Sequence, residues 1–207
     1  MQRTPFITLD GLDGSGKTLQ LARLAGWLRD RGIDVVTCRD PGSTATGDAV
    51  RAILLDRHDL ALAATTEMLL YMAARAQLVA EIVRPALERG SWVVSDRYLL
   101  ANVVYQGHAG GLEPDVVRSV GAIATGGLAP DLTLLLDVDL ATAARRLARP
   151  LDRLERRGDD YRSRVRAGYL AEARTDPGRI VVVDATDGPD VVADRIRTIV
   201  ESRFALG

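Results

Sequence analysis

Short apolar runs alternate with longer amphipathic stretches along the whole chain of 207 residues. The apolar runs suit strands that are buried on both faces, and they are FITLD, DVVTC, WVVSD, LTLLLDV and RIVVVDA. Helical spacing predicts helices between them, at 17–31, 46–55, 64–89, 113–125, 139–148, 158–173 and 188–203. This alternation predicts βαβ units and therefore an α/β fold built on a parallel sheet.

No repeat, low-complexity tract or interdomain linker interrupts this pattern, so we expect a single domain over residues 1–207. One segment departs from it, the charge-dense run RRLARPLDRLERRGDDYRSR at 145–164. A solvated charged helix is the simplest interpretation of such a run. The alternative, which its arginines favour below, is a small lid at about 149–160 within the same domain.

The first apolar run leads into a glycine-rich loop, GLDGSGKT, at residues 11–18. It matches the pattern G-x-x-x-x-G-K-[ST] through Gly11, Gly16, Lys17 and Thr18. Such a loop points its backbone N–H groups at phosphate oxygens, while the lysine reaches the β and γ phosphates and the hydroxyl binds Mg²⁺. Lys17 is the only lysine among the 27 basic residues. Because the loop follows a strand and opens a helix, the sequence predicts a nucleotide-phosphate site.

A carboxylate at the end of a neighbouring buried strand is the second part of such a site. Asp96 closes the run SWVVSD, and could simply cap the element that follows. Alongside the phosphate loop, however, it is expected to hold Mg²⁺ together with Thr18, directly or through water. The sequence therefore predicts a nucleotide and Mg²⁺ as bound groups.

The composition is that of an ordinary soluble protein, with 47% apolar and 27% charged residues and a formal net charge of −1. No overall basic field would attract nucleic acid or anionic lipid, so neither is expected as a partner. No signal peptide and no apolar stretch long enough to cross a membrane is recognisable. The single cysteine, Cys38, is typical of a reducing compartment, so a cytoplasmic location is expected.

Other classes of nucleotide-binding protein fit less well. A GTPase would need an N-K-x-D motif, yet the only asparagine, Asn102, has no lysine near it. A motor or AAA-type ATPase is usually longer. The chain length and an arginine directly after Asp96 favour a small-molecule kinase, in which positioned cations carry most of the catalysis.

Two groups of arginines supply such cations. Arg39, Arg51 and Arg97 lie at or soon after the carboxyl ends of strands, where ligands bind in open α/β sheets. The second group lies in the charged segment and consists of Arg149, Arg153, Arg156 and Arg157. Spacings of three and four would put most of this group on one helix face, which favours a lid that closes over the phosphate donor.

With these features the chain resembles the thymidylate kinases, the ATP:dTMP phosphotransferases among the nucleoside monophosphate kinases. The resemblance is carried by LDGLDGSGKT, RDPGST, TEMLLYMAARAQ, SDRYLLANVVYQG, GGLAPDLTLLLDV and PLDRLE. Many proteins share the first stretch, whereas AARAQ, DRY…YQG and PDLTLLLDV in this order are specific to the family. The resemblance implies a doubly wound five-stranded parallel sheet in the order 2-3-1-4-5, with flanking helices and a small lid. It also implies a homodimer packed through the long helices, including 64–89, and production of dTDP and ADP for dTTP biosynthesis.

The family's donor-site roles carry over by resemblance. Those implied for the ATP phosphates are Gly11, Leu12, Asp13, Gly14, Ser15, Gly16, Lys17, Thr18, Arg149 and Arg153. Family members place a helper arginine either in the phosphate loop or in the lid. Because the variable loop position is Ser15, Arg153 is expected to be the transition-state cation, worth roughly three to five powers of ten in rate. Lys17, Asp13 and Arg97 complete the residues implied to act in catalysis.

The acceptor-site roles also rest on the resemblance. Those implied for dTMP are Asp13, Arg39, Asp40, Arg51, Tyr71, Arg75, Arg97, Asn102, Tyr105 and Gln106. The three arginines at 39, 51 and 97 would grip the phosphate, and Asp13 would approach the 3′-hydroxyl. Tyr71 would stack on thymine while Arg75 donates to its O4. Their i, i+4 spacing supports a shared target, although an ordinary core aromatic is the alternative for Tyr71.

The remaining base contacts come from the stretch after Asp96. Asn102 and Gln106, again four apart, would meet the edge of the base, and Tyr105 would crowd the 2′ position against ribose. The DATDGP loop at 184–189 is a weak candidate for contact with adenine.

The chain departs from the family pattern at three positions. Asp40 replaces a usual glutamate, Ser43 a usual glycine, and Ala101 a usual hydroxyl residue. Two alternatives therefore stay open, another nucleoside monophosphate or deoxynucleoside kinase with altered base preference, and a nucleotide-binding module without transfer activity. His58 and His108 have no partner that the sequence identifies and are expected at the surface or in loops.

Overall fold

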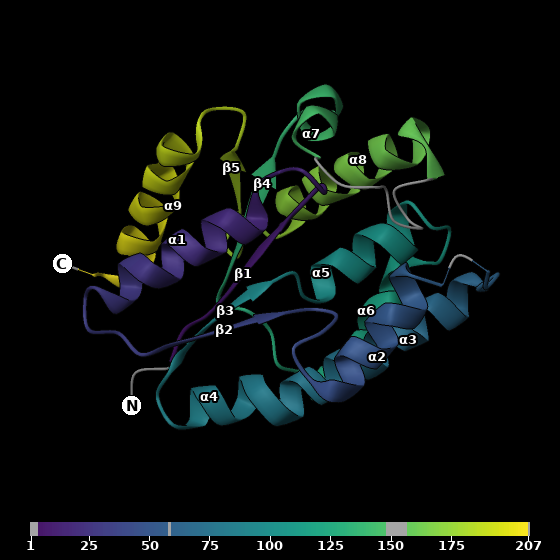
Figure 1. Ribbon diagram of the computed structural model, residues 1–207, viewed down its shortest axis with the longest axis horizontal. Helices are drawn as coiled ribbons and strands as arrows, with labels where there is room; N and C mark the ends of the chain where they lie inside the picture. The colour runs from purple at the N-terminus through teal and green to yellow at the C-terminus, as the bar shows by residue number, and fades with distance from the viewer. Residues whose placement is uncertain (1–3, 58, 148–156, 207) are drawn as a thin grey trace.

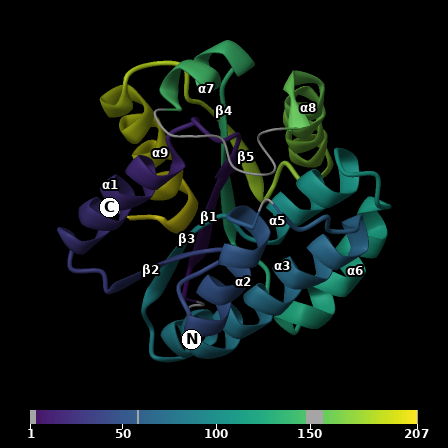
Figure 2. The same cartoon turned by 45° about the vertical axis from the view of Figure 1, so that its right-hand side comes forward.

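A computed structural model describes residues 4–57, 59–147 and 157–206. Five parallel strands form one sheet in the order β2-β3-β1-β4-β5 (Figures 1 and 2). The strands are β1 (Phe6–Gly11), β2 (Val35–Arg39), β3 (Trp92–Asp96), β4 (Leu132–Asp137) and β5 (Ile180–Asp184). The predicted fold class and strand order are therefore confirmed.

Helices cover both faces of this sheet. They are α1 (Lys17–Arg29), α2 (Ala45–Leu55), α3 (Ala64–Leu78), α4 (Arg84–Glu88), α5 (Leu99–Asn102), α6 (Pro114–Thr125), α7 (Leu140–Arg146), α8 (Asp159–Thr175) and α9 (Pro189–Phe204). Figure 1 shows α1 and α9 together on one side, and α5 and α8 on the other, with α3 and α6 beyond them. Among the residues described, no helix combines the length and apolar character needed to span a bilayer.

The helix predicted over 64–89 is interrupted in its hydrogen-bond pattern. The π-helical segment η1 (Val79–Val83) separates α3 from α4. Pro85 lies at the start of α4, and a proline lacks the N–H that would continue the regular i to i−4 ladder. The wider π turn just before Pro85 accommodates that missing bond, so the segment stays helical from residue 64 to 88.

A second helical region, 99–108, does not appear in the hydrophobic pattern. It consists of α5 and the π-helical segment η2 (Val103–His108). Residues 102–107 are all buried, so polar and apolar positions do not alternate with a helical period. This region follows β3 directly and carries Asn102, Tyr105 and Gln106 to the carboxyl end of the sheet.

The central strands of the sheet bury many apolar side chains completely. Ile7 and Leu9 of β1, Val94 of β3, and Leu134 and Leu136 of β4 have no exposed surface. Burial of each such side chain contributes about 1.5–3 kcal/mol, which makes the sheet a rigid base. Parallel strands all end at one edge of this base, and the loops that follow them there form the candidate site.

Candidate active site

Two adjoining cavities lie at the carboxyl ends of the strands. The first has a volume of about 790 Å³ and is called the large cavity here. The second has a volume of about 80 Å³ and is called the small pocket. Four residues line both cavities, and they are Asp13, Asp40, Arg51 and Arg97. The two spaces are therefore neighbours that share one wall.

The phosphate loop forms the floor of the large cavity, through residues 14–18. Gly16 has a φ of 93°, in the left-handed region that favours glycine, and α1 begins at the next residue. A Cβ on Gly14 would lie 2.2 Å from the carbonyl oxygen of Ala143, so a side chain there would clash with α7. These glycines let the backbone curl at the positive end of the α1 dipole, as an anion site requires.

Lys17 lies in this loop with its side chain buried. Its Nζ donates to the carbonyl oxygens of Gly11 and Leu12, at 3.1 and 2.8 Å, and lies 3.7 Å from Asp13. Gly11 and Leu12 thus hold the lysine and do not line the cavity among the residues described. Burial and the nearby Arg97 lower the pKa of Lys17.

Thr18 and Asp96 lie together, as the sequence predicts for a metal pair. The Thr18 hydroxyl donates to Asp96 Oδ2 at 2.8 Å, and both residues line the large cavity. The contact joins the first turn of α1 to the end of β3. A hydroxyl oxygen beside a carboxylate is the kind of donor set that suits Mg²⁺, with substrate phosphates as further ligands.

Arg97 occupies the wall between the two cavities. Its Nη2 donates to Asp13 Oδ1 at 2.7 Å and to the Tyr105 hydroxyl at 3.2 Å, while Nη1 donates to the Tyr169 hydroxyl at 2.9 Å. Burial by itself lowers the pKa of Arg97, but the neighbouring Tyr105 and Asp13 raise it well above its usual value. The residue has a φ of 70°, so a fixed and uncommon backbone conformation aims this cation at the shared wall.

Asp10, at the end of β1, lies beneath this network and has no exposed surface. Its Oδ1 accepts a hydrogen bond from the Tyr169 hydroxyl at 3.1 Å. Burial raises the pKa of Asp10 to about 7, although Arg97 and Lys17 oppose the shift. Sequence reasoning did not identify Asp10 or Tyr169, because neither belongs to the fixed positions of a motif.

The other two arginines of the first group lie at the same edge. Arg39 is half exposed at the end of β2, with Nη2 3.8 Å from Asp48. Arg51 of α2 donates to the carbonyl oxygen of Pro41 at 3.0 Å. Burial and the neighbouring Arg39 lower the pKa of Arg51. The two positive charges repel each other, and a bound anion would relieve this repulsion.

The small pocket collects most of the residues implied for the acceptor. It is lined by Asp13, Asp40, Pro41, Arg51, Leu55, Tyr71, Arg75, Arg97, Ala101, Asn102, Tyr105 and Gln106. Nine of the ten residues implied for dTMP are in this set, and the tenth, Arg39, lines the large cavity. Pro41, Leu55 and Ala101 are the additional lining residues. Leu55 had no sequence signal, whereas Pro41 belongs to the RDPGST stretch but was given no role there.

A buried ion pair closes one side of the small pocket. Arg75 Nε donates to Asp40 Oδ2 at 2.5 Å, and both side chains are almost without exposed surface. Arg75 Nη2 also donates to the carbonyl oxygen of Tyr98 at 3.4 Å. The aspartate at position 40, which departs from the usual glutamate, is therefore long enough to contact Arg75 directly.

Ser43 also departs from the family pattern, and its backbone explains why glycine is usual there. Its φ is 65°, in the left-handed region that most side chains disfavour. The serine side chain compensates in part, because its Oγ accepts a hydrogen bond from the Arg39 backbone N–H at 2.9 Å. Ser43 therefore supports the backbone of Arg39 in place of the usual glycine.

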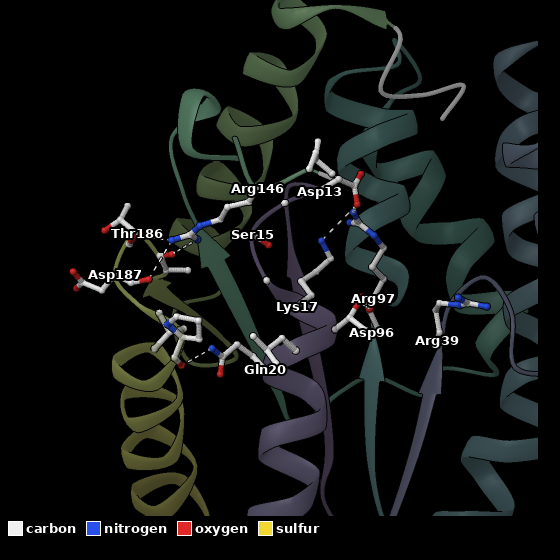
Figure 3. A pocket seen from close by; sticks show the side chains of 18 of the residues that line it. Asp13, Ser15, Lys17, Gln20, Arg39, Asp96, Arg97, Arg146, Thr186 and Asp187 are labelled. Atoms are coloured by element: carbon white, nitrogen blue, oxygen red, sulfur yellow. Dashed lines mark hydrogen bonds and ion pairs between the residues drawn. The ribbon is translucent and has the colours of Figure 1, made fainter. Parts of the chain in front are cut away.

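The far wall of the large cavity comes from α7 and from residues 185–189. Arg146 donates to the carbonyl oxygens of Ala185, Thr186 and Asp187, at 2.6, 2.8 and 3.1 Å (Figure 3). Gln20 of α1 donates to the carbonyl oxygen of Pro189 at 2.8 Å. The loop named as a candidate for adenine contact thus borders the cavity, whereas Arg146 was missed because it sits in a run of similar arginines.

Some predicted residues lie outside the described part of the chain. These are Arg149, Arg153, Arg156 and His58. His108 lies at the surface, as expected, and it ends η2 with its Nε2 2.6 Å from Glu172 Oε1 of α8. Glu172 also accepts from Arg118 at 2.5 Å. The partner was invisible in the sequence because the two residues are 64 positions apart.

Comparison with known proteins decides the family. A sequence profile described as thymidylate kinase matches residues 9–196. A thymidylate kinase from Desulforudis audaxviator is 47% identical over 98% of this chain and 94% of its own. The chain belongs to the thymidylate kinase family. It is therefore an enzyme and a kinase.

Other relatives agree with this assignment. A thymidylate kinase from Bifidobacterium longum is 44% identical, over 90% of this chain and 92% of its own. The crystal structure of thymidylate kinase from Ehrlichia chaffeensis superimposes with a TM-score of 0.78 at 27% identity, covering 95% of this chain and 98% of that one. The likeness to the family thus extends over nearly the whole chain.

Proposed function

We propose that the chain transfers the γ-phosphate of ATP to dTMP, giving dTDP and ADP, with ATP in the large cavity and dTMP in the small pocket. The observation that carries this proposal is the wall that the two cavities share. Arg97 and Asp13 line both spaces and are joined by a 2.7 Å contact. A phosphate held against this wall would face the phosphate loop, as transfer between two bound nucleotides requires.

The acceptor would lie with its phosphate toward the arginines and its base toward α3 and α5. Arg51 and Arg97 line both cavities, and Arg39 lines the large cavity. Tyr71 and Arg75 line the small pocket and not the large cavity, and they would stack on the base and donate to O4, respectively. Asp13 is then close to the acceptor sugar. The arginines would neutralise charge on the transferred group and so lower the barrier electrostatically.

Mg²⁺ fits beside the phosphate loop. Thr18 and Asp96 offer adjacent oxygens that line the large cavity. The described residues hold no cluster of three or more histidine, cysteine or acidic side chains, so the remaining ligands would be phosphate oxygens and water. When bound, the ion would neutralise charge on the donor phosphates. Lys17 would hold the same phosphates from the loop side.

The lid role of residues 149–160 remains part of the proposal. Leu147, just before the segment, lines the large cavity, and Arg157, within the segment, donates a hydrogen bond to Glu67 of α3. Arg153 would supply the transition-state cation. We expect Arg153→Ala to lower kcat by about 10³-fold or more while the KM for ATP changes little. Turnover within a few-fold of the parent enzyme would show that the lid assignment is wrong.

The acceptor is tested with a coupled assay of ADP release. Purified enzyme would be given ATP, Mg²⁺ and, in turn, dTMP, dUMP, dCMP, dGMP and thymidine. We expect the highest kcat/KM with dTMP, and at least about 10³-fold less with thymidine, which lacks the phosphate that the arginines would bind. A higher kcat/KM with a purine monophosphate or with thymidine would contradict the proposal.

A homodimer is proposed through the outer faces of α3 and α6. These helices pack against each other and expose Leu69, Val116 and Ile123, the last with 83% of its surface accessible. Exposed apolar side chains on adjacent helices suit a protein interface. Light scattering should give the mass of a dimer, and Ile123→Glu should shift it toward the monomer. A monomeric parent enzyme at micromolar concentration would exclude the dimer.

A cytoplasmic location is proposed from the cysteine content. Cys38 is buried and unpaired, and burial raises the pKa of its thiol to about 12. Such a thiol is unreactive and needs no oxidising compartment. Cell fractionation should find the enzyme in the soluble cytoplasmic fraction, and recovery elsewhere would contradict this location.

A further inference from the structure

A chain of hydrogen bonds leads from α3 to the small pocket. Glu67 of α3 accepts through Oε1 from Gln106 Nε2 at 2.9 Å. Gln106 in turn accepts through Oε1 from Asn102 Nδ2 at 2.7 Å. All three residues are at most 2% exposed, so no solvent competes for these bonds. The last two line the small pocket, whereas Glu67 stands behind them.

The direction of these bonds follows from the chemistry of Glu67. A carboxylate only accepts hydrogen bonds, whereas a primary amide has a donating and an accepting end. Gln106 must therefore turn its NH₂ group toward Glu67 and its oxygen toward Asn102. Asn102 must then donate through its NH₂ group to the Gln106 oxygen. One acidic side chain thus sets the orientation of two amides.

This orientation leaves an acceptor at the pocket. Asn102 Oδ1 is buried and has no hydrogen-bond partner among the described residues. A buried carbonyl oxygen without a donor costs free energy, so a ligand that brings an N–H to it is favoured. Asn102 is the only residue of the three with such an unused oxygen among the described side chains.

A cation compensates the charge of Glu67 from the other side. Arg157 Nη2 donates to Glu67 Oε2 at 2.9 Å, and this arginine lies just before α8. The two carboxylate oxygens thus have separate partners, with Gln106 on one and Arg157 on the other. The ion pair and the amide chain can be separated by mutation for that reason.

We propose that Glu67 is a positioning residue that determines the pyrimidine specificity of the small pocket. It makes Asn102 present an acceptor, which suits the N3–H of thymine or uracil. Cytosine carries a lone pair at N3, so its N3 would face Asn102 Oδ1 with no hydrogen available to form a bond between the two acceptors. The inference rests on the proposed function, because it requires the base of the acceptor nucleotide to lie in the small pocket.

The test is the ratio of kcat/KM for dTMP to that for dCMP in Glu67→Gln. A glutamine at 67 can donate as well as accept, so both amides can reverse and Asn102 can offer its NH₂ group to the pocket. We expect the ratio to fall by roughly 10- to 100-fold, mainly through a higher KM for dTMP, with the KM for ATP unchanged. Arg75 is present in both the parent enzyme and Glu67→Gln, so its preference for O4 contributes equally to both ratios.

Glu172→Gln is the matched control. Glu172 is 6% exposed, accepts from Arg118 and lies against His108 of the same helical region, but it lines neither cavity among the residues described. This variant removes another buried charge and should keep the ratio within about twofold. A ratio for Glu67→Gln that matches this control would overturn the proposal.

Two further variants distinguish control of amide orientation by Glu67 from a merely structural role of this residue. In the double variant Glu67→Gln with Gln106→Glu, the carboxylate at 106 again forces Asn102 to donate, although Arg157 has lost its charged partner. The double variant should recover most of the dTMP preference, and Arg157→Gln should retain it. If Glu67→Gln does not fold, the double variant alone still tests the idea. Failure to prefer dTMP there, or loss of preference in Arg157→Gln, would overturn it.

Asn102→Ala distinguishes failure of this inference from failure of the proposed function. The variant should raise the KM for dTMP by about tenfold or more if the base lies in the small pocket. An unchanged KM would reject that placement and with it the role of Glu67. A raised KM in Asn102→Ala with an unaltered ratio in Glu67→Gln would reject only the role of Glu67.

Discussion

The large cavity and the small pocket are built in different ways. The large cavity is about 790 Å³ and owes its phosphate site to backbone, namely the loop at 14–18 and the start of α1. The small pocket is about 80 Å³ and is walled by side chains from α2, α3, α5 and η2. Backbone N–H groups recognise phosphate in any nucleotide, whereas side chains can distinguish one base from another. Selectivity in this enzyme should therefore reside in the small pocket.

Removing the cation of the large cavity is expected to have the largest effect. Lys17→Ala deletes the only side-chain cation of the phosphate loop, and kcat should fall by about 10³-fold or more. The Kd of dTMP, measured by calorimetry without ATP, should change by less than about threefold, because Lys17 lines only the large cavity. A loss of dTMP affinity as large as the loss of kcat would mean that ATP and dTMP do not bind in separate cavities.

A change in the buried ion pair that lines the small pocket should instead affect the stability of the protein and the binding of dTMP. Asp40→Asn leaves the buried Arg75 without its charged partner, which should cost about 3 kcal/mol of unfolding free energy in urea. The KM for dTMP should rise while that for ATP stays constant. Asp137→Asn breaks the partly exposed pair with Arg166 and should cost less than about 1 kcal/mol. Similar costs for both variants would contradict the buried role of Asp40.

The free energy of unfolding should depend on pH through Asp10, which lies beneath the Arg97 network. The folded pKa of Asp10 is about 7, against 3.8 in an unfolded chain, so between these values the folded state holds a proton that the unfolded state releases. Stability contributed by this group therefore falls as pH rises through that window, by up to about 4 kcal/mol in total. Asp10→Asn should remove this loss. Urea unfolding of both enzymes from pH 4 to 8 measures it, and parallel curves would contradict it.

The smallest effect is expected at the far wall of the large cavity. Gln20→Met removes the bond to the Pro189 carbonyl while keeping the side-chain volume, at a cost of about 1 kcal/mol. The KM for ATP should rise a few-fold, and the KM for dTMP should not change. Steady-state kinetics with each substrate varied in turn distinguishes the two. A selective rise in the KM for dTMP would mean that this wall affects dTMP binding and not ATP binding, which would contradict the assignment of ATP to the large cavity.

The same contrast explains how much was predictable from sequence. The strands and the phosphate loop have local signatures, because glycines at Gly11 and Gly16 and buried apolar runs report directly on backbone geometry. The small pocket has fewer such signatures, because apart from Arg51 and Arg97, which lie at or soon after strand ends, its residues were implied only by resemblance to a family. The partners of Arg97 and Glu67 lie up to 90 positions away, so only the folded chain reveals them. The helix at 99–108 escaped for a similar reason, since burial on all sides removes its periodic signal.

The division of the two substrates is tested most directly by a crystal structure with dTMP bound. We predict that the thymine ring lies in the small pocket between Tyr71 and Arg75, within hydrogen-bond distance of Asn102 Oδ1. Its phosphate should face Arg51 and Arg97 at the shared wall. A base bound in the large cavity, with the small pocket unchanged, would contradict the account.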